Sequence, residues 1–118
     1  MIPEEFIPYF NPVFERTPLS VTAINVKDMT SYTEVVLVVE AASKRQASSI
    51  AEHIITQLKK ENKQVLGAEG VKDGEWALLD YGDIIIHVFE TEAKAFYDID
   101  GLWSDAPRMD LSQFESEE

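Results

Sequence analysis

The sequence predicts an α/β domain built on a mixed sheet of about five strands, with helices packed mainly on one face. Two apolar runs joined by a Gly-Asp pair predict a β-hairpin over Trp76–Phe89. A short β-branched run predicts a buried strand over Glu34–Glu40. An apolar stripe at three- and four-residue spacing predicts an amphipathic helix over Ser43–Asn62. At 118 residues the chain fits one domain, since domains commonly hold roughly 100–200 residues.

The N-terminal segment, residues 1–18, is rich in proline. Pro3, Pro8, Pro12 and Pro18 interrupt a run of aromatic and aliphatic residues. Each proline removes a backbone donor and crowds the preceding turn, which opposes a long helix. We therefore expect an extended or single-turn segment whose aromatic side chains lie across the body of the domain.

Three elements are expected between this segment and the hairpin region. Alternating residues over Val21–Val26 predict the first strand, and the run over Glu34–Glu40 is the second. The long helix begins with a capping box made by Ser43 and Gln46. Asn62 is suited to the left-handed conformation that ends many helices.

A short strand over Val65–Gly70 and a turn at Asp73–Gly74 lead into the hairpin. The hairpin turn is Gly82–Asp83, in which glycine takes the positive φ. A shorter helix is expected over Thr91–Leu102. Residues 112–118 have the composition of an acidic tail, and we expect this tail to be mobile.

Both faces of the hairpin need cover, because neither of its strands has a clean polar side. Side-chain alternation places Trp76 and Asp80 on one face and Tyr81 on the other. One long helix and one short helix can cover one face of a five-stranded sheet, and the proline-rich segment can cover part of the second. Apolar surface left near solvent usually marks a protein contact. The pattern therefore predicts a partner for this sheet.

Composition narrows the class of partner. The net charge of -12, from 22 acidic and 10 basic residues, repels phosphate backbones. We therefore expect a basic protein partner and no direct nucleic-acid binding. No apolar run approaches the ~20 residues that cross a bilayer, so no membrane partner is expected. The acidic Glu4 and Glu5 are unlike a targeting signal, which favours a cytoplasmic location.

No motif in the chain predicts catalysis, a metal or a cofactor. The absence of cysteine excludes thiolate sites and disulfides. His53 and His87 are far apart in sequence and lack metal-ligand spacing. Asp98 and Asp100 have the spacing of a two-carboxylate metal motif, but near the end of a helix positions i and i+2 do not face each other. The glycines match no phosphate-binding loop. We expect a protein that is not an enzyme.

Trp76 is the strongest candidate for a contact residue. Tryptophan provides the large, rigid surface that dominates binding hot spots. Glu69, Asp80 and Asp83 lie in or near the same hairpin. An apolar patch ringed by carboxylates suits the surface of a basic protein.

Three stretches of this sequence resemble the Iojap-type ribosomal silencing factors, the RsfS family. They are GAEG at Gly67–Gly70, WALLDYGDIIIHVF at Trp76–Phe89 and FYDIDGLWSDAPRMDL at Phe96–Leu111. The resemblance covers residues 19–111, which we take as the ribosomal silencing factor-like domain. It departs from the family pattern at Asn25, where relatives carry aspartate, and in the prolines of the N-terminal segment.

The resemblance implies an α/β fold with nucleotidyltransferase-like topology but without the catalytic motif of those enzymes. It implies binding to the large ribosomal subunit through large-subunit ribosomal protein fourteen, which blocks subunit joining and represses translation under nutrient limitation. It also implies a homodimer in isolation. The implied partner-binding residues are Trp76, Asp80, Tyr81 and Asp83 of the hairpin, with Glu69 nearby. We expect Trp76 and Tyr81 to pack together on one apolar spot of the partner.

Two alternatives remain open from the residues alone. The apolar sheet face could pair with a second copy, which would make the chain a dimerisation module unrelated to the ribosome. Asp98 and Asp100 could instead hold a metal ion in a nucleotidyltransferase-like enzyme.

Overall fold

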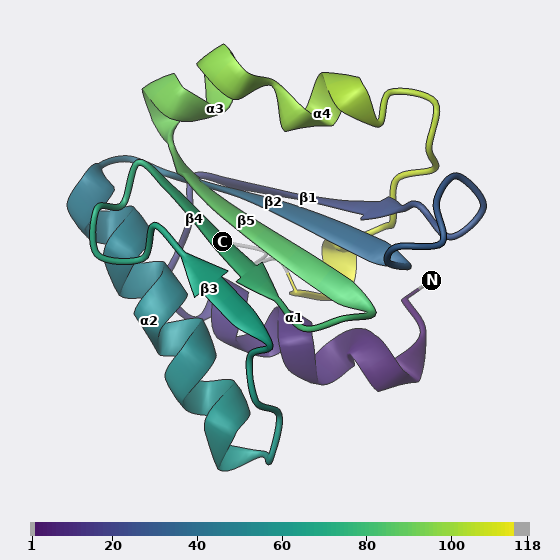
Figure 1. The fold of residues 1–118 in the computed structure, drawn as a ribbon, viewed down its shortest axis with the longest axis horizontal. Coiled ribbons are helices and arrows are strands. Elements are labelled where there is room, and N and C mark those ends of the chain that lie inside the picture. Colours follow the sequence, from purple (N-terminus) through teal and green to yellow (C-terminus); the bar gives the residue numbers. More distant parts are fainter. Residues whose placement is uncertain (1, 115–118) are drawn as a thin grey trace.

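A computed structural model of the chain describes residues 2–114. It contains one five-stranded sheet with the strand order β1-β2-β5-β4-β3, and helices lie on both sides of it (Figure 1). The elements are, in chain order, η1 Glu4–Phe6, α1 Ile7–Phe14, β1 Ser20–Asn25, β2 Val35–Ala41, α2 Lys44–Lys60, β3 Gly67–Glu69, β4 Trp76–Asp80, β5 Ile84–Glu90, α3 Thr91–Tyr97, α4 Ile99–Leu102 and η2 Ser112–Phe114. The predicted fold class, an α/β domain on a mixed five-stranded sheet, is confirmed.

The sheet is mixed because β2 and β5 run parallel at its centre. Their register pairs Val38 with His87. The remaining three pairs of neighbouring strands are antiparallel. The chain between β2 and β5 contains α2, the helix that a parallel connection requires. The likeness to nucleotidyltransferase topology stays a prediction.

Helix α2 begins and ends where the sequence predicts. Ser43 Oγ accepts a hydrogen bond from the Gln46 backbone N–H at 3.1 Å. The Gln46 side chain reaches one residue further back than in a standard capping box, and its Oε1 accepts from the Ala42 N–H at 2.6 Å. Asn62 has a φ of 64°, the left-handed conformation expected beyond the helix end.

The N-terminal segment forms a helix, and the expectation of an extended or single-turn segment is wrong. Pro8 lies in the first turn of α1, where backbone N–H groups have no partner within the helix. Only Pro12 removes a hydrogen bond inside the helix. Burial of Phe6, Phe10 and Val13 against the sheet outweighs that single loss.

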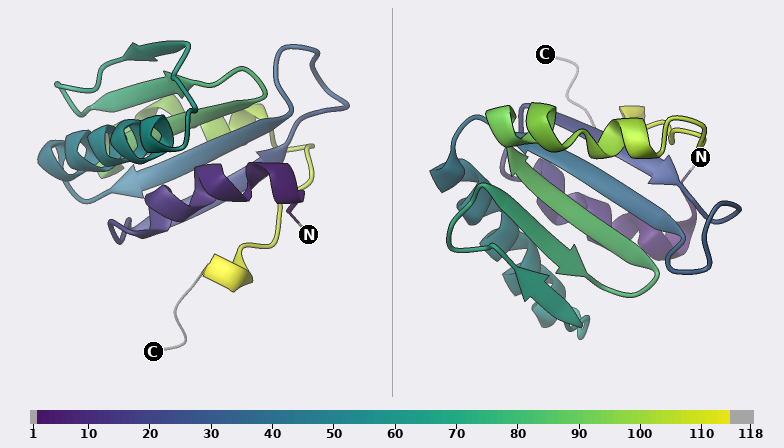
Figure 2. Two further views of the ribbon diagram at one scale, coloured as in Figure 1. Left: turned by 90° about the horizontal axis from the view of Figure 1, so that it is seen from below. Right: turned by 45° about the horizontal axis from the view of Figure 1, so that its top comes forward.

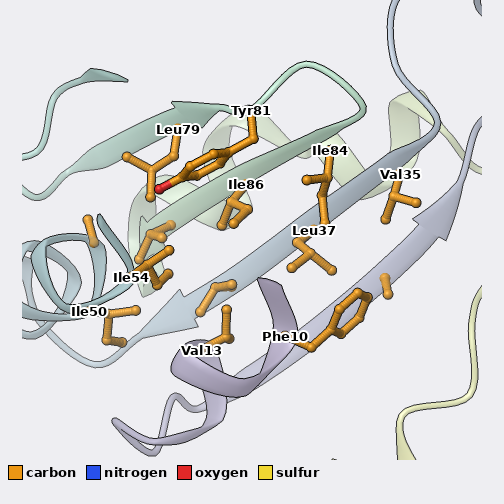
Figure 3. Packing of buried hydrophobic residues seen from close by; sticks show 14 of the residues in the cluster. Phe10, Val13, Val35, Leu37, Ile50, Ile54, Leu79, Tyr81, Ile84 and Ile86 are labelled. Atoms are coloured by element: carbon orange, nitrogen blue, oxygen red, sulfur yellow. The ribbon is translucent and has the colours of Figure 1, made fainter. Parts of the chain in front are cut away.

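Helices α1 and α2 cover the same side of the sheet, which we call the first face (Figure 2). The side chains beneath them form the larger of two apolar clusters. Figure 3 shows Phe10 and Val13 of α1 and Ile50 and Ile54 of α2 directed toward Leu37 and its neighbours in the central strands.

The short helices α3 and α4 lie on the opposite side, the second face (Figure 2). The helix expected over Thr91–Leu102 is divided by Asp98, whose φ is 49°. The sequence predicts that the N-terminal segment covers the face opposite to the long helix, and this is wrong. Helix α1 covers the first face together with α2, and α3 and α4 cover the second face. The second cluster contains Ile24, Val26, Val36, Val38, Phe89, Ala93 and Ala106.

After α4 the chain passes around the outer edge of β1. The Asn25 N–H donates to the Pro107 carbonyl at 2.9 Å, and the Met109 N–H donates to the Ala23 carbonyl at 2.8 Å. Phe114 then stacks on Phe10 of α1, with ring centroids 5.4 Å apart. Residues 112–114 thus form the short helix η2, and residues 115–118 lie outside the described residues, so mobility of the tail over 112–118 stays a prediction.

Candidate functional site

The hairpin turn has the predicted two-residue form. Gly82 has a φ of 89°, and the Tyr81 N–H donates to the Ile84 carbonyl at 3.0 Å across the turn. Asp80 Oδ1 accepts from the Gly82 N–H at 2.8 Å. The Asp83 side chain is exposed at the tip, while its carbonyl accepts from two N–H groups at the start of β2. The turn is thus fixed to the sheet beside it.

Strand alternation separates the two aromatic residues that were expected to form one contact. Trp76, Leu78 and Asp80 lie on the second face, whereas Tyr81 is directed to the first face and is buried there against Tyr9 of α1. A single patch containing Trp76 and Tyr81 is therefore wrong. Partner binding by each of the five residues named from the sequence stays a prediction.

The Tyr81 hydroxyl is enclosed without a hydrogen-bond partner among residues 2–114. Its ring meets the Tyr9 ring edge-on, with centroids 5.4 Å apart. Burial, and secondly the neighbouring Tyr9, raise the pKa of Tyr81 to about 12. The hydroxyl therefore carries the cost of desolvation with no bond to offset it.

We expect Tyr81→Phe to raise the free energy of unfolding by about 1 kcal/mol, because it removes an unsatisfied buried hydroxyl and keeps the ring. Urea unfolding of both proteins measures the change. Tyr97→Phe is the matched control, since that ring is 40% exposed and its hydroxyl remains hydrated. A destabilised Tyr81→Phe protein would mean that the hydroxyl is hydrogen-bonded.

The second face carries an aromatic cluster around Trp76. The indole lies 5.0 Å from the Phe89 ring and 4.6 Å from the Tyr97 ring of α3, measured between centroids. Its Nε1–H donates to His87 Nδ1 at 3.0 Å. Burial lowers the pKa of His87 to about 4, so the imidazole is neutral near pH 7. The sequence predicts that Trp76 and His87 lie on neighbouring strands. The contact between Trp76 and Tyr97 could not be predicted, because it depends on where α3 lies over the sheet.

Within residues 2–114, part of the second face has no helix over it. Helix α3 packs on β2 and β5, and the right view of Figure 2 shows no helix in front of β4 and β3. We call this region the open face: Glu69 of β3, Trp76, Leu78 and Asp80 of β4, and His87 of β5. Trp76, Leu78 and Asp80 are half-buried, and Glu69 is exposed.

Further apolar side chains are exposed on the neighbouring helices. Phe96 of α3 is 80% exposed, and Leu102 of α4 is 69% exposed. A hollow of about 480 Å³ is lined by Phe96 and Tyr97 together with Lys44, Glu75, Glu90, Glu92 and Ala93. Large exposed apolar side chains bordered by carboxylates suit protein association better than the enclosure of a small ligand.

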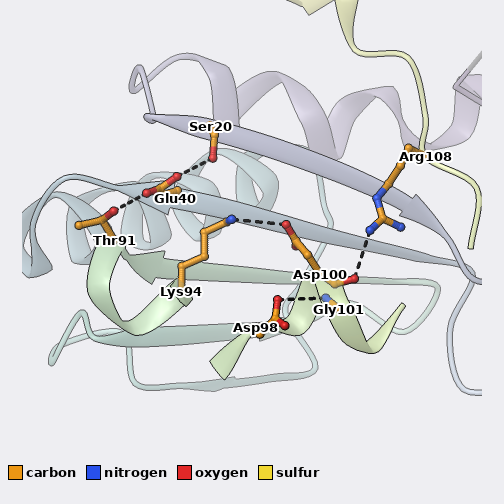
Figure 4. Close-up of polar contacts among 8 residues, drawn as sticks. All are labelled: Ser20, Glu40, Thr91, Lys94, Asp98, Asp100, Gly101 and Arg108. Carbon is orange, nitrogen blue, oxygen red and sulfur yellow. Dashed lines mark hydrogen bonds and ion pairs between the residues drawn. The ribbon is translucent and has the colours of Figure 1, made fainter. Parts of the chain in front are cut away.

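Helix α3 is fixed to the sheet through Glu40 of β2 (Figure 4). Glu40 accepts hydrogen bonds from the Thr91 hydroxyl and, at 2.8 Å, from the Ser20 hydroxyl of β1. These bonds, Thr91 first, lower the pKa of Glu40. The carboxylate therefore connects two strands with the first residue of the helix.

The two aspartates considered for metal binding have structural partners (Figure 4). Asp98 Oδ1 accepts from the Gly101 N–H at 3.2 Å and caps α4. Asp100 Oδ2 lies 3.4 Å from Lys94 Nζ. The backbone carbonyl of Asp100 accepts from Arg108 at 3.1 Å. Each carboxylate thus serves the conformation of α4 or its contact with α3.

Neither a metal centre nor a membrane span is found in the part of the chain that the structure describes. Within residues 2–114, histidines and carboxylates do not gather in a group of three that could hold a metal ion. No helix in the same range combines the length and the apolar character needed to cross a membrane.

Comparisons with known proteins agree with this architecture. The family model "Ribosomal silencing factor during starvation" matches residues 13–118. Ribosomal silencing factor RsfS of Halalkalibacterium halodurans is 29% identical over 101 residues, which cover 86% of each chain. RsfS of Bacillus subtilis is 31% identical over 91 residues, or 77% of each chain. A solved structure of a Chromobacterium violaceum protein matches with a TM-score of 0.82 and 27% identity over 88% of each chain. The chain therefore belongs to the RsfS family of ribosomal silencing factors.

Proposed function

We propose that this chain binds the large ribosomal subunit through large-subunit ribosomal protein fourteen and blocks joining of the small subunit. It would thereby repress translation in the cytoplasm under nutrient limitation. Family membership supports a role in silencing ribosomes. The action is steric and involves no catalysis, since a bound domain occupies the space that the small subunit needs.

The open face is the observation that carries the proposal. Trp76 and Leu78 present half-buried apolar surface, and the acidic side chains of Glu69 and Asp80 lie beside them. The net charge of -12 favours encounter with a basic protein and makes association weaken as salt rises. Apolar contacts supply the affinity, and the carboxylates pair with lysine or arginine at the rim.

We expect Leu78→Lys to weaken binding to large subunits at least tenfold, because it places a cation in the apolar centre of the contact and opposite a basic partner. Leu19→Lys is the matched control, since Leu19 is exposed next to β1, at the other end of the sheet. Gradient sedimentation with separated subunits measures binding, and a subunit-joining assay measures the block. If Leu78→Lys binds large subunits as tightly as Leu19→Lys and the wild type do, the open face is not the contact surface.

The same surface could join two copies of the chain when ribosomes are absent. The exposed Phe96 of α3 and Leu102 of α4 favour self-association. Electrostatic repulsion between two copies, each with a net charge of -12, opposes self-association. We therefore propose a homodimer that large subunits dissociate. Sedimentation of the free protein and of its mixture with large subunits tests this, and a dimer that persists on the subunit would contradict it.

A further inference from the structure

The imidazole of His87 has two nitrogens in different surroundings. Nδ1 accepts the hydrogen bond from Trp76 Nε1 at 3.0 Å. An indole nitrogen can only donate, so Nδ1 carries no proton, and the neutral ring holds its proton on Nε2. The depressed pKa of His87, about 4, keeps the ring in this neutral form near pH 7.

The second nitrogen of His87 remains free to donate. Within residues 2–114, Nε2 makes no hydrogen bond, and it is not among the fully enclosed polar atoms that lack a partner. Those atoms are Thr33 Oγ1, Tyr81 OH and Asp100 Oδ1. His87 as a whole is only 8% exposed, and the N–H of Nε2 keeps a small contact with solvent on the open face, where His87 lies opposite Leu78.

We propose that His87 is a positioning and recognition residue of the open face: Nδ1 fixes the Trp76 indole, and Nε2–H donates to an acceptor oxygen of the docked protein. This inference rests on the proposed function. A carbonyl, carboxylate or hydroxyl oxygen matches the donor, whereas a lysine or arginine placed over His87 would leave it unpaired. The partner's cations are thereby directed to Glu69 and Asp80 at the rim. Burial of an unmatched donor is the general means by which such sites reject a wrong partner.

Two substitutions separate the two roles of His87. In His87→Asn the amide oxygen takes the place of Nδ1, and nothing takes the place of Nε2. In His87→Leu both groups are lost. The chain has two tryptophans, Trp76 and Trp103, so each indole N–H gives a resolvable signal in a ¹⁵N NMR spectrum. The hydrogen-exchange rate of the Trp76 indole N–H reports whether its hydrogen bond to residue 87 is formed.

We expect the Trp76 indole signal of the wild type and of His87→Asn to exchange slowly, and that of His87→Leu to exchange at least tenfold faster. Binding to large subunits should weaken about tenfold in His87→Asn and further in His87→Leu. Normal binding by His87→Asn would overturn the donor role. An unchanged indole signal in His87→Leu would overturn the positioning role.

Failure of the proposed function is distinguishable from failure of this inference. If Leu78→Lys binds large subunits as the wild type does, the open face is not the contact surface. The recognition role of His87 is then excluded as well. The indole measurement needs no ribosome and tests the positioning role alone. Circular dichroism of both His87 variants shows whether each is folded at the temperature of the binding assay.

Discussion

Phe10→Ala is expected to lower the free energy of unfolding by about 4 kcal/mol, within the range of roughly 3–5 kcal/mol for phenylalanine truncation in a core. Phe10 is fully buried, stacks on Phe114 and lies between α1 and the sheet. Its loss leaves a cavity and weakens the packing of α1, which covers the first face together with α2. Urea unfolding followed by far-ultraviolet circular dichroism measures the change.

The matched control for this prediction is Phe96→Ala, the same substitution on another short helix. Phe96 is 80% exposed, so the expected change is within about 0.5 kcal/mol. A loss below about 1 kcal/mol in Phe10→Ala would mean that α1 is not packed on the sheet in solution. The extended N-terminal segment expected from the prolines would then be correct.

Acidification from pH 7 to pH 4 is expected to cost about 3 kcal/mol of stability through His87 alone. The pKa of this group is about 4 in the folded state, against 6.5 for an unperturbed histidine. Between these values the unfolded chain binds the proton and the folded chain does not. The stability is therefore fully present above pH 6.5, declines as the pH falls, and about 2 kcal/mol of it is lost by pH 5.

The window from pH 6.5 to 5 isolates His87 from the carboxylates. Glu40, whose pKa is lowered by its bonds to Thr91 and Ser20, contributes stability that is lost only at more acidic pH. His87→Asn should remove most of the loss within the window. His53→Gln, which replaces the histidine on α2, should retain it. Urea midpoints measured at pH 7, 6 and 5 give the result, and equal pH dependence in His87→Asn and the wild type would refute the assignment.

The sequence placed the candidate site on the hairpin Trp76–Phe89, but the residues it named do not share one surface. Pattern reasoning identified Trp76, Asp80 and Glu69, which share the second face. It also named Tyr81, which the same alternation directs into the first cluster. The sequence assigned no contact to His87, because nothing in its neighbours along the chain reveals that Trp76 of the adjacent strand donates to it. The contribution of Tyr97 depends on the way α3 turns back over β5.

The sequence by itself determined the strands, both ends of α2, the turn at Gly82 and the membership of the RsfS family. The strands, the helix ends and the turn depend on residue period, capping and backbone preference, which act between neighbours in the chain. The family is indicated by the resemblance of three sequence stretches. Only the tertiary structure decided that α1 forms despite Pro12, which face each helix covers, and that Trp76 meets His87 and Tyr97. Those outcomes depend on how much apolar surface each segment buries against distant parts of the chain, and this is a balance that no local pattern records.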